Sequence, residues 1–347
     1  MNQAMENKKP QGSISAKNGL ILGVVFAFTF TLFIWYLGPD LKHFVDTFLP
    51  RVETWYYPWQ LPVRDGMGMA IVWVLYLAHQ GLVWGLIYWA QKNLLTEKIQ
   101  PVNMLLKYNL AVFAVNLFFI FLHLVQTHIW FDGLAKDTQI LTSQGSVIIM
   151  LAIILVIENA RRGLILGKRA GKPFTPNVMG WFRHNHMYII AWALVYTFWF
   201  HPMATDPQLL SGFFYMFLLF TQMSLAYTWI HLDKRWIVLL ESFVAIHAVF
   251  VAVYNTIFFG GPDMWPMFFS GFAFMFVFTY LYAFRQTRWV YGAVTVIYVA
   301  FLVWLYAPFG YARGFSIALR FEALWIPIIL YGLTIAFAGV AYLKIRK

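Results

Sequence analysis

The chain of 347 residues contains no cysteine. This absence excludes a disulfide framework, thiolate metal sites, iron–sulfur clusters and cysteine nucleophiles. Charged residues are also scarce, at 11% of the chain, whereas soluble globular domains carry about 25%. Hydrophobic residues make up 61%, and the mean hydropathy is +0.66. These values indicate a polytopic membrane protein, and no nucleic acid is expected as a partner.

Two families of metal motif are missing as well. The HExxH pattern of zinc peptidases is absent, and so are the HxxxH and HxxHH spacings of membrane di-iron oxygenases. His123 and His128 are five residues apart, which places them on different faces of a helix. Both enzyme classes are therefore disfavoured.

Long apolar stretches recur ten times along the chain. Each has about 18 or more residues, the length that a helix needs to cross about 30 Å of hydrocarbon. Continuous apolar runs predict helices rather than the strands of a barrel. We therefore expect an all-α polytopic membrane protein, a bundle of about ten transmembrane helices. The stretches are 20-37, 67-91, 106-130, 145-166, 187-204, 208-231, 235-259, 265-284, 288-307 and 322-343.

The basic residues predict the orientation of these spans. With ten spans, nineteen of the 25 Lys and Arg residues fall on one side of the membrane and six on the other. Basic residues in short loops favour the cytoplasm. We therefore expect both termini to be cytoplasmic, in a bacterial inner membrane, and the first helix to remain uncleaved.

The chain divides into a short tail and one large domain. Residues 1-19 are polar and predict a disordered cytoplasmic tail, and 20-347 predict a single transmembrane helical domain. Segment 39-66 is expected outside, where its amphipathic and aromatic residues suit the membrane interface. Segment 161-186 is basic and is expected to meet anionic lipid headgroups on the cytoplasmic side of the bilayer.

Four histidines have a spacing that is typical of bound haem. His186 and His201 are 15 residues apart, which corresponds to about 22 Å of helix rise, and His231 and His247 are 16 apart. Two helices that each offer an imidazole at two depths can hold stacked b-type haems. We predict that these four residues bind a cofactor, either haem b or a transition metal.

Three further histidines lie within or at the end of apolar spans. His79, His123 and His128 are candidate metal ligands, because an ionisable side chain in the membrane usually marks a site. The alternative is that a neutral imidazole joins two helices by hydrogen bonds.

Glu241 and His184 are the candidate acid and base residues. Glu241 lies inside a span with no basic residue at i+4, so it needs a partner from another helix. We expect that partner to be His186 or His231. Glu158 is expected to pair with Arg161 or Arg162 along its own helix.

No diagnostic family motif is present, so the expected function depends on these residues. We expect an oxidoreductase or electron-transfer subunit that uses haem or a metal with a quinone or another lipophilic substrate. One alternative is a lipid-modifying enzyme in which His184, His186 and His231 act with Glu241. Another is a proton-coupled transporter that uses His79, His247 and Glu241. The sequence predicts no particular partner subunit.

Overall fold

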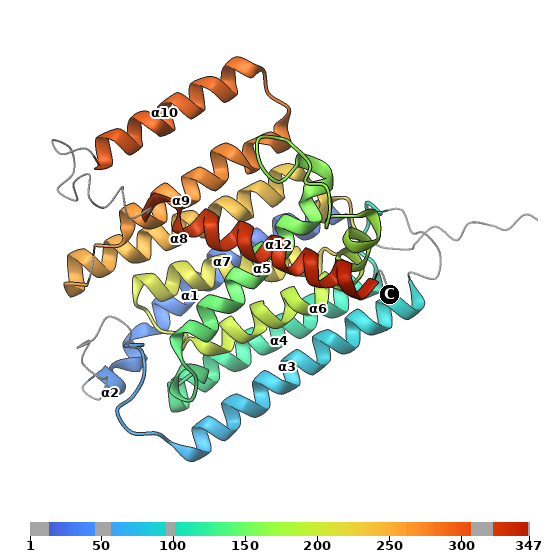
Figure 1. The fold of residues 1–347 in the computed structure, drawn as a ribbon. Helices are drawn as coiled ribbons and strands as arrows, with labels where there is room; N and C mark the ends of the chain where they lie inside the picture. Colours follow the sequence, from blue (N-terminus) through green and yellow to red (C-terminus); the bar gives the residue numbers. More distant parts are fainter. Residues whose placement is uncertain (1–13, 46–56, 95–100, 262, 307–321, 346–347) are drawn as a thin grey trace, which may run out of the picture.

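The structure is a computed structural model that describes residues 14–45, 57–94, 101–261, 263–306 and 322–345. Every regular element in these ranges is a helix, which confirms the expected all-α class. Figure 1 shows the long helices running side by side in one bundle.

The elements fall into ten long helices and six short ones in the described ranges. The long helices are α1 (Ala16–Leu37), α3 (Gly66–Asn93), α4 (Lys107–Trp130), α5 (Ile140–Arg162), α6 (Pro176–Phe200), α7 (Pro207–Ser224), α8 (Lys234–Phe259), α9 (Trp265–Phe278), α10 (Arg288–Tyr306) and α12 (Trp325–Ile345). The short ones are η1 (Gly38–Leu41), α2 (Lys42–Val45), η2 (Leu134–Lys136), η3 (Ile230–Leu232), η4 (Tyr280–Phe284) and η5 (Glu322–Leu324).

Eight helices of the described chain are long and apolar enough to cross a membrane, so the protein is of the multi-pass membrane type. They do not include α6 and α7, which occupy the places of two expected spans. The reason is composition. Arg183, His184 and His186 lie in the first half of α6, and Gln208 and Gln222 lie near the two ends of α7.

The centre of the bundle is aromatic. α6 packs against α3, α5 and α7, and α7 also packs against α1, α4 and α8. The largest fully buried side chains include Trp199 and Phe198 on α6 and Phe213 and Phe217 on α7. In contrast, α10 lies at one edge of the bundle, where it packs against α9 (Figure 1).

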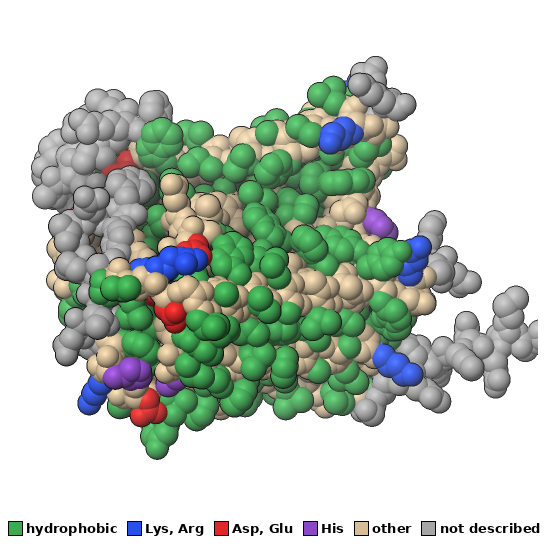
Figure 2. All heavy atoms as spheres, turned by 90° about the horizontal axis from the view of Figure 1, so that it is seen from below, with side chains coloured by type: hydrophobic (Ala, Val, Ile, Leu, Met, Phe, Trp, Pro, Cys, Tyr) green, Lys and Arg blue, Asp and Glu red, His purple; other side chains and the backbone are tan. Residues whose placement is uncertain are grey.

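The outer surface has a membrane-like distribution of side chains. In Figure 2, hydrophobic side chains cover the middle of the face shown, and charged side chains gather toward its two ends. One end, where α5, α7 and α9 finish and α6, α8 and α10 begin, is called the basic end below. It carries Arg161, Lys168, Arg183, Lys234 and Arg285.

The opposite end is held together by a small polar cluster. The backbone N–H of Leu61 donates to Asp132 (2.8 Å), and Arg64 donates to Asp137 (2.7 Å), which also accepts from Trp73. Burial raises the pKa of Asp132 to about 6, although the Leu61 N–H opposes the shift. These contacts tie the start of α3 to the connection between α4 and α5.

The two polar segments expected from the sequence are described only in part. Residues 1–13 of the expected tail and 46–56 of the expected external segment lie outside the described ranges. The first helix begins at Ala16, earlier than expected, because Ser15 caps it by accepting from the N–H of Asn18. In the other segment, Gly38–Val45 is helical, and Tyr57 is buried against the ring of His201 (5.5 Å between centroids).

Candidate functional site

A cavity of about 510 Å³ lies at the basic end between α5, α6, α7 and α8. Its wall is mostly apolar, with Met150, Leu151, Ile154, Leu219 and Met223 among the lining residues. The polar and charged side chains of the wall are Glu158, Arg161, Arg183, His186, Tyr215, Gln222, Tyr227, His231 and Glu241.

His186 and His231 converge on this cavity from two different elements. His186 is on α6 and His231 is on η3, and their ring centroids are 6.3 Å apart. The sequence predicted both as cofactor ligands, and the structure brings their rings close together.

The hydrogen bonds of the two rings fix their tautomers. Nδ1 of His186 donates to the Arg183 carbonyl (2.7 Å), and Nδ1 of His231 donates to the Gln222 carbonyl (2.9 Å). Since a carbonyl only accepts, the proton of each neutral imidazole is on Nδ1. Each Nε2 then keeps a lone pair, and it has no hydrogen-bond partner among the described residues.

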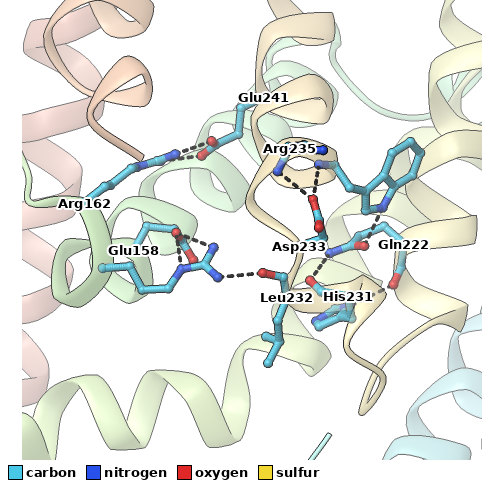
Figure 3. A network of polar contacts seen from close by, with 10 residues as sticks. Glu158, Arg162, Gln222, His231, Leu232, Asp233, Arg235 and Glu241 are labelled. Carbon is cyan, nitrogen blue, oxygen red and sulfur yellow. Dashed lines mark hydrogen bonds and ion pairs between the residues drawn. The ribbon is translucent and has the colours of Figure 1, made fainter. Parts of the chain in front are cut away.

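Gln222 holds His231 in place through several contacts (Figure 3). Its side-chain amide donates to the backbone carbonyl of His231 (3.1 Å), and its side-chain oxygen accepts from Nε1 of Trp236 (2.7 Å). Burial lowers the pKa of His231 from its ordinary value of 6.5, and Arg161 lowers it further against the effect of the Gln222 carbonyl. His231 is therefore neutral at pH 7 and can accept a hydrogen bond or bind a metal.

Arg161 joins α5 to the same short helix. It donates to Glu158 (2.7 Å) and, through Nη1, to the carbonyl of Leu232 (2.7 Å). The expected helix pair of Glu158 is thus confirmed for Arg161, at the i+3 spacing.

Glu241 does not have the partner that we expected. It forms a two-pronged ion pair with Arg162, with N to O distances of 2.5 and 2.6 Å, and both side chains are buried. Figure 3 shows Arg162 reaching across from α5 to α8. The expected hydrogen bond to His186 or His231 is therefore wrong. The reason is that a buried carboxylate is stabilised best by a fully ionised guanidinium of matching shape.

His184, the second candidate for acid or base chemistry, is exposed and is not among the residues that line the cavity. Its backbone carbonyl accepts from Gln91 of α3 (2.7 Å). This contact gives the residue a place in helix packing.

The two other predicted cofactor ligands lie away from this cavity. Nδ1 of His201 donates to the Thr197 carbonyl (2.8 Å). Nδ1 of His247 donates to the Ser211 hydroxyl (2.9 Å), which itself donates to the Gln208 carbonyl (2.9 Å). In both rings the proton is therefore on Nδ1, as it is in His186 and His231.

Two of the three candidate metal ligands, His79 on α3 and His123 on α4, have both ring nitrogens hydrogen-bonded. Trp199 donates to Nδ1 of His79 (3.2 Å), and Nε2 of His79 donates to Asn116 (3.1 Å). In His123, Nδ1 contacts the side-chain oxygen of Gln126 and Nε2 contacts the His201 carbonyl, both at 2.8 Å. Neither residue offers a free lone pair to a metal.

His128 differs from these two residues. Its Nδ1 donates to the Leu124 carbonyl (2.8 Å), and its buried Nε2 has no partner in the described part of the chain. No group of three or more His, Cys, Asp or Glu side chains that could hold a metal ion is found among the described residues.

Arg162, Arg183 and Gln222 are important parts of the site that sequence reasoning did not select. Arg183 contributes to the prediction of orientation as one of the basic residues, and Arg162 was expected as a possible partner of Glu158 on its own helix. A signal for Arg162 was present, because two basic residues follow Glu158 and only one of them can pair with it. Comparisons with known protein families, with curated proteins and with solved structures find no match.

Proposed function

We propose that this chain is a ten-span protein of a bacterial inner membrane, with both termini in the cytoplasm, and that it works in electron transfer or a related oxidoreductase reaction. The proposed cofactor is a haem between His186 and His231. The observation that supports this most directly is that two imidazoles converge on one cavity. In each of them Nδ1–H donates a hydrogen bond to a backbone carbonyl.

The separation of the two rings would allow both imidazoles to hold one metal. A metal bound by both nitrogens at about 2.0–2.1 Å would bring the ring centres to about 6 Å from each other. The centroids of His186 and His231 are 6.3 Å apart. A volume of about 510 Å³ also lies within the usual range of cofactor sites, about 300–1,000 Å³.

The number of protein ligands favours haem over a non-haem metal. Catalytic and structural zinc sites use three or four protein ligands, and no such group is found in the described ranges. A porphyrin supplies four nitrogens itself, so two axial histidines are sufficient. When bound, it would supply one-electron redox chemistry.

The surroundings of the histidines suit a lipid-soluble reaction partner. The wall of the cavity is mostly apolar, and the outward faces of the helices are apolar too. A quinone is a substrate of this class. In this proposal, the backbone carbonyls of Arg183 and Gln222 orient the two imidazoles.

The absorption spectrum of the purified protein between about 350 and 700 nm tests the proposal, together with haem extraction. We expect a Soret band in the wild type and its loss in both His186→Ala and His231→Ala, because each variant removes one axial ligand. His184→Ala is the matched control, since His184 is two residues from His186 but does not line the cavity; it should keep the band. A wild type without haem contradicts the proposal.

A second function is supported by one feature of the same cavity. The free Nε2 of His186 and His231 can accept protons beside Arg183, so the residues could perform acid/base chemistry on a lipid headgroup. Glu241 is not the base in this version, because Arg162 binds both of its oxygens. This second function predicts a colourless wild-type protein that modifies a lipid headgroup, and it predicts that His231→Ala abolishes this activity.

A further inference from the structure

The charges around the cavity leave one positive charge without a partner. Glu158 pairs with Arg161, and Glu241 pairs with Arg162, so these four residues form two neutral pairs. Arg183 also lines the cavity, and its side chain has no hydrogen-bond or ion-pair partner in the described residues. With neutral histidines, these five residues carry a net charge of one positive unit, although Arg162 pairs with Glu241 from outside the lining of the cavity.

The polarity of the wall changes along the cavity. Arg183 is exposed, His186 one turn further along α6 is half-buried, and Leu151, Tyr215 and Glu241 are buried. The hydroxyl of Tyr215 donates to the Leu240 carbonyl (2.9 Å). The deep part therefore presents satisfied or apolar groups, and the free cation lies where the cavity meets the basic end.

We infer that the occupant of this cavity is an amphiphile with an anionic group, a carboxylate or a phosphate, that binds Arg183, while its apolar body lies between α5 and α7. The inference rests on the proposed function in one respect: both concern the same cavity. A haem, which carries carboxylates, and an anionic lipid both have this chemistry.

The chemistry of the guanidinium supports this choice of ligand. Its fork of N–H groups matches the two oxygens of a carboxylate or phosphate and gives short, charge-assisted hydrogen bonds. An anion that approaches Arg183 gains this interaction without breaking an existing ion pair. Arg161, in contrast, already pairs with the carboxylate of Glu158 and donates to the Leu232 carbonyl, so its charge is balanced before any ligand binds.

Binding of oleate to the purified protein tests the inference, with methyl oleate as the uncharged probe that has the same apolar body. We expect the wild type to bind oleate about tenfold more tightly than methyl oleate, because only oleate can form the charge-assisted contact. A tenfold ratio of Kd corresponds to about 1.4 kcal/mol of binding free energy. Arg183→Gln should remove the preference and leave binding of methyl oleate unchanged, which also shows that the variant is folded. Arg288→Gln removes an exposed basic residue that does not line the cavity and should keep the preference.

Equal binding of the two probes by the wild type, or a preference that survives in Arg183→Gln, overturns the inference. The natural occupant is identified by absorbance and by mass spectrometry of the solvent extract. A Soret band that weakens in Arg183→Gln assigns the anionic group to haem, and a colourless extract with an anionic lipid assigns it to the lipid. In the latter case the inference holds and the proposed function fails.

Discussion

At the scale of single residues, the hydrogen bonds of the two ring nitrogens determine what each histidine can bind. In His79, both nitrogens are used by other side chains, so the ring joins helices. In His186 and His231, Nδ1–H donates a hydrogen bond to a backbone carbonyl, and Nε2 keeps a free lone pair. A backbone partner of this kind both orients the ring and fixes the tautomer that a metal ligand needs.

The buried pair of Arg162 and Glu241 gives a prediction about stability. Glu241→Leu leaves a buried guanidinium without a counter-charge, and the loss of one partner of a buried pair costs about 3–5 kcal/mol. The double variant Arg162→Leu with Glu241→Leu removes both charges, so it should be more stable than the single variant. Equilibrium unfolding in a denaturing detergent, with the four members of a double-mutant cycle, measures the coupling. A double variant that is as unstable as the sum of the single variants contradicts this view.

Asp132 gives a prediction about pH dependence. Burial raises its pKa from 3.8 to about 6, so the native state binds a proton more tightly than the unfolded state does. Its contribution to the free energy of unfolding is therefore fully present below about pH 3.8 and is lost as the pH rises through about 6. Relative to Asp132→Asn, the thermal midpoint of the wild type should rise as the pH is lowered from about 7 to about 4. A difference that stays constant or changes in the other direction disagrees with this account.

Sequence reasoning predicted contacts within one helix better than contacts between helices. The pair of Glu158 and Arg161 follows from i+3 spacing and is present. The partner of Glu241 could not be predicted, because it depends on how α5 and α8 are rotated about their axes. His186 and His231 lie close together because the start of α6 and the connection after α7 are at the same end of the bundle.

At the scale of elements, the connection between α7 and α8 is the part of the fold that positions the site. Asp233 caps α8 by accepting from the N–H groups of Arg235 and Trp236. Gln222 near the end of α7 contacts His231 of η3 and Trp236 of α8. A short helix fixed on both sides can hold His231 at one distance from α6.

A chain of hydrogen bonds through His79 links four helices. Trp199 of α6 donates to His79 of α3, which donates to Asn116 of α4, which donates to Ser224 of α7 (3.1 Å). Hydrogen bonds between membrane helices contribute about 0.6 kcal/mol on average and about 1.7 kcal/mol at most.

We therefore expect His79→Leu to lower the free energy of unfolding by about 1–3 kcal/mol, since it breaks two such bonds and leaves their partners buried and unpaired. Unfolding of the purified protein in a denaturing detergent measures this change. Leu77→Ala, which truncates an exposed residue of the same helix, is the control and should have a smaller effect. Loss of the Soret band in folded His79→Leu would instead indicate a direct role in cofactor binding.

Element boundaries were predicted well where a span is uniformly apolar and poorly where it is not. The third span was expected at 106-130, and α4 is Lys107–Trp130. The sixth was expected at 208-231, but α7 ends at Ser224, and the chain then turns through Tyr227, which has a positive φ of 66°. Its residues Gln222 and Thr228 form hydrogen bonds within this turn, and hydropathy does not register such bonds.

At the scale of the whole molecule, the basic end contains the cavity and most of the basic residues that the structure describes. If this end is cytoplasmic, the proposed cofactor and the anionic group of any occupant lie close to the cytoplasmic leaflet.

The natural absence of cysteine makes orientation easy to measure. Gly171→Cys lies in the exposed connection before α6, and Val63→Cys lies in the exposed connection before α3, at the opposite end. In intact cells, an impermeant maleimide should label Val63→Cys, whereas Gly171→Cys should react only after permeabilisation. The reverse pattern contradicts the proposed orientation.

The electron paramagnetic resonance spectrum of the oxidised protein, measured with the haem content per chain, tests the central claim most directly. If His186 and His231 are the two axial ligands of a haem, the wild type contains haem in a low-spin state, and His231→Ala converts it to a high-spin state or loses it. Wild-type protein that contains no haem, or low-spin haem that is unchanged in both His186→Ala and His231→Ala, contradicts the claim.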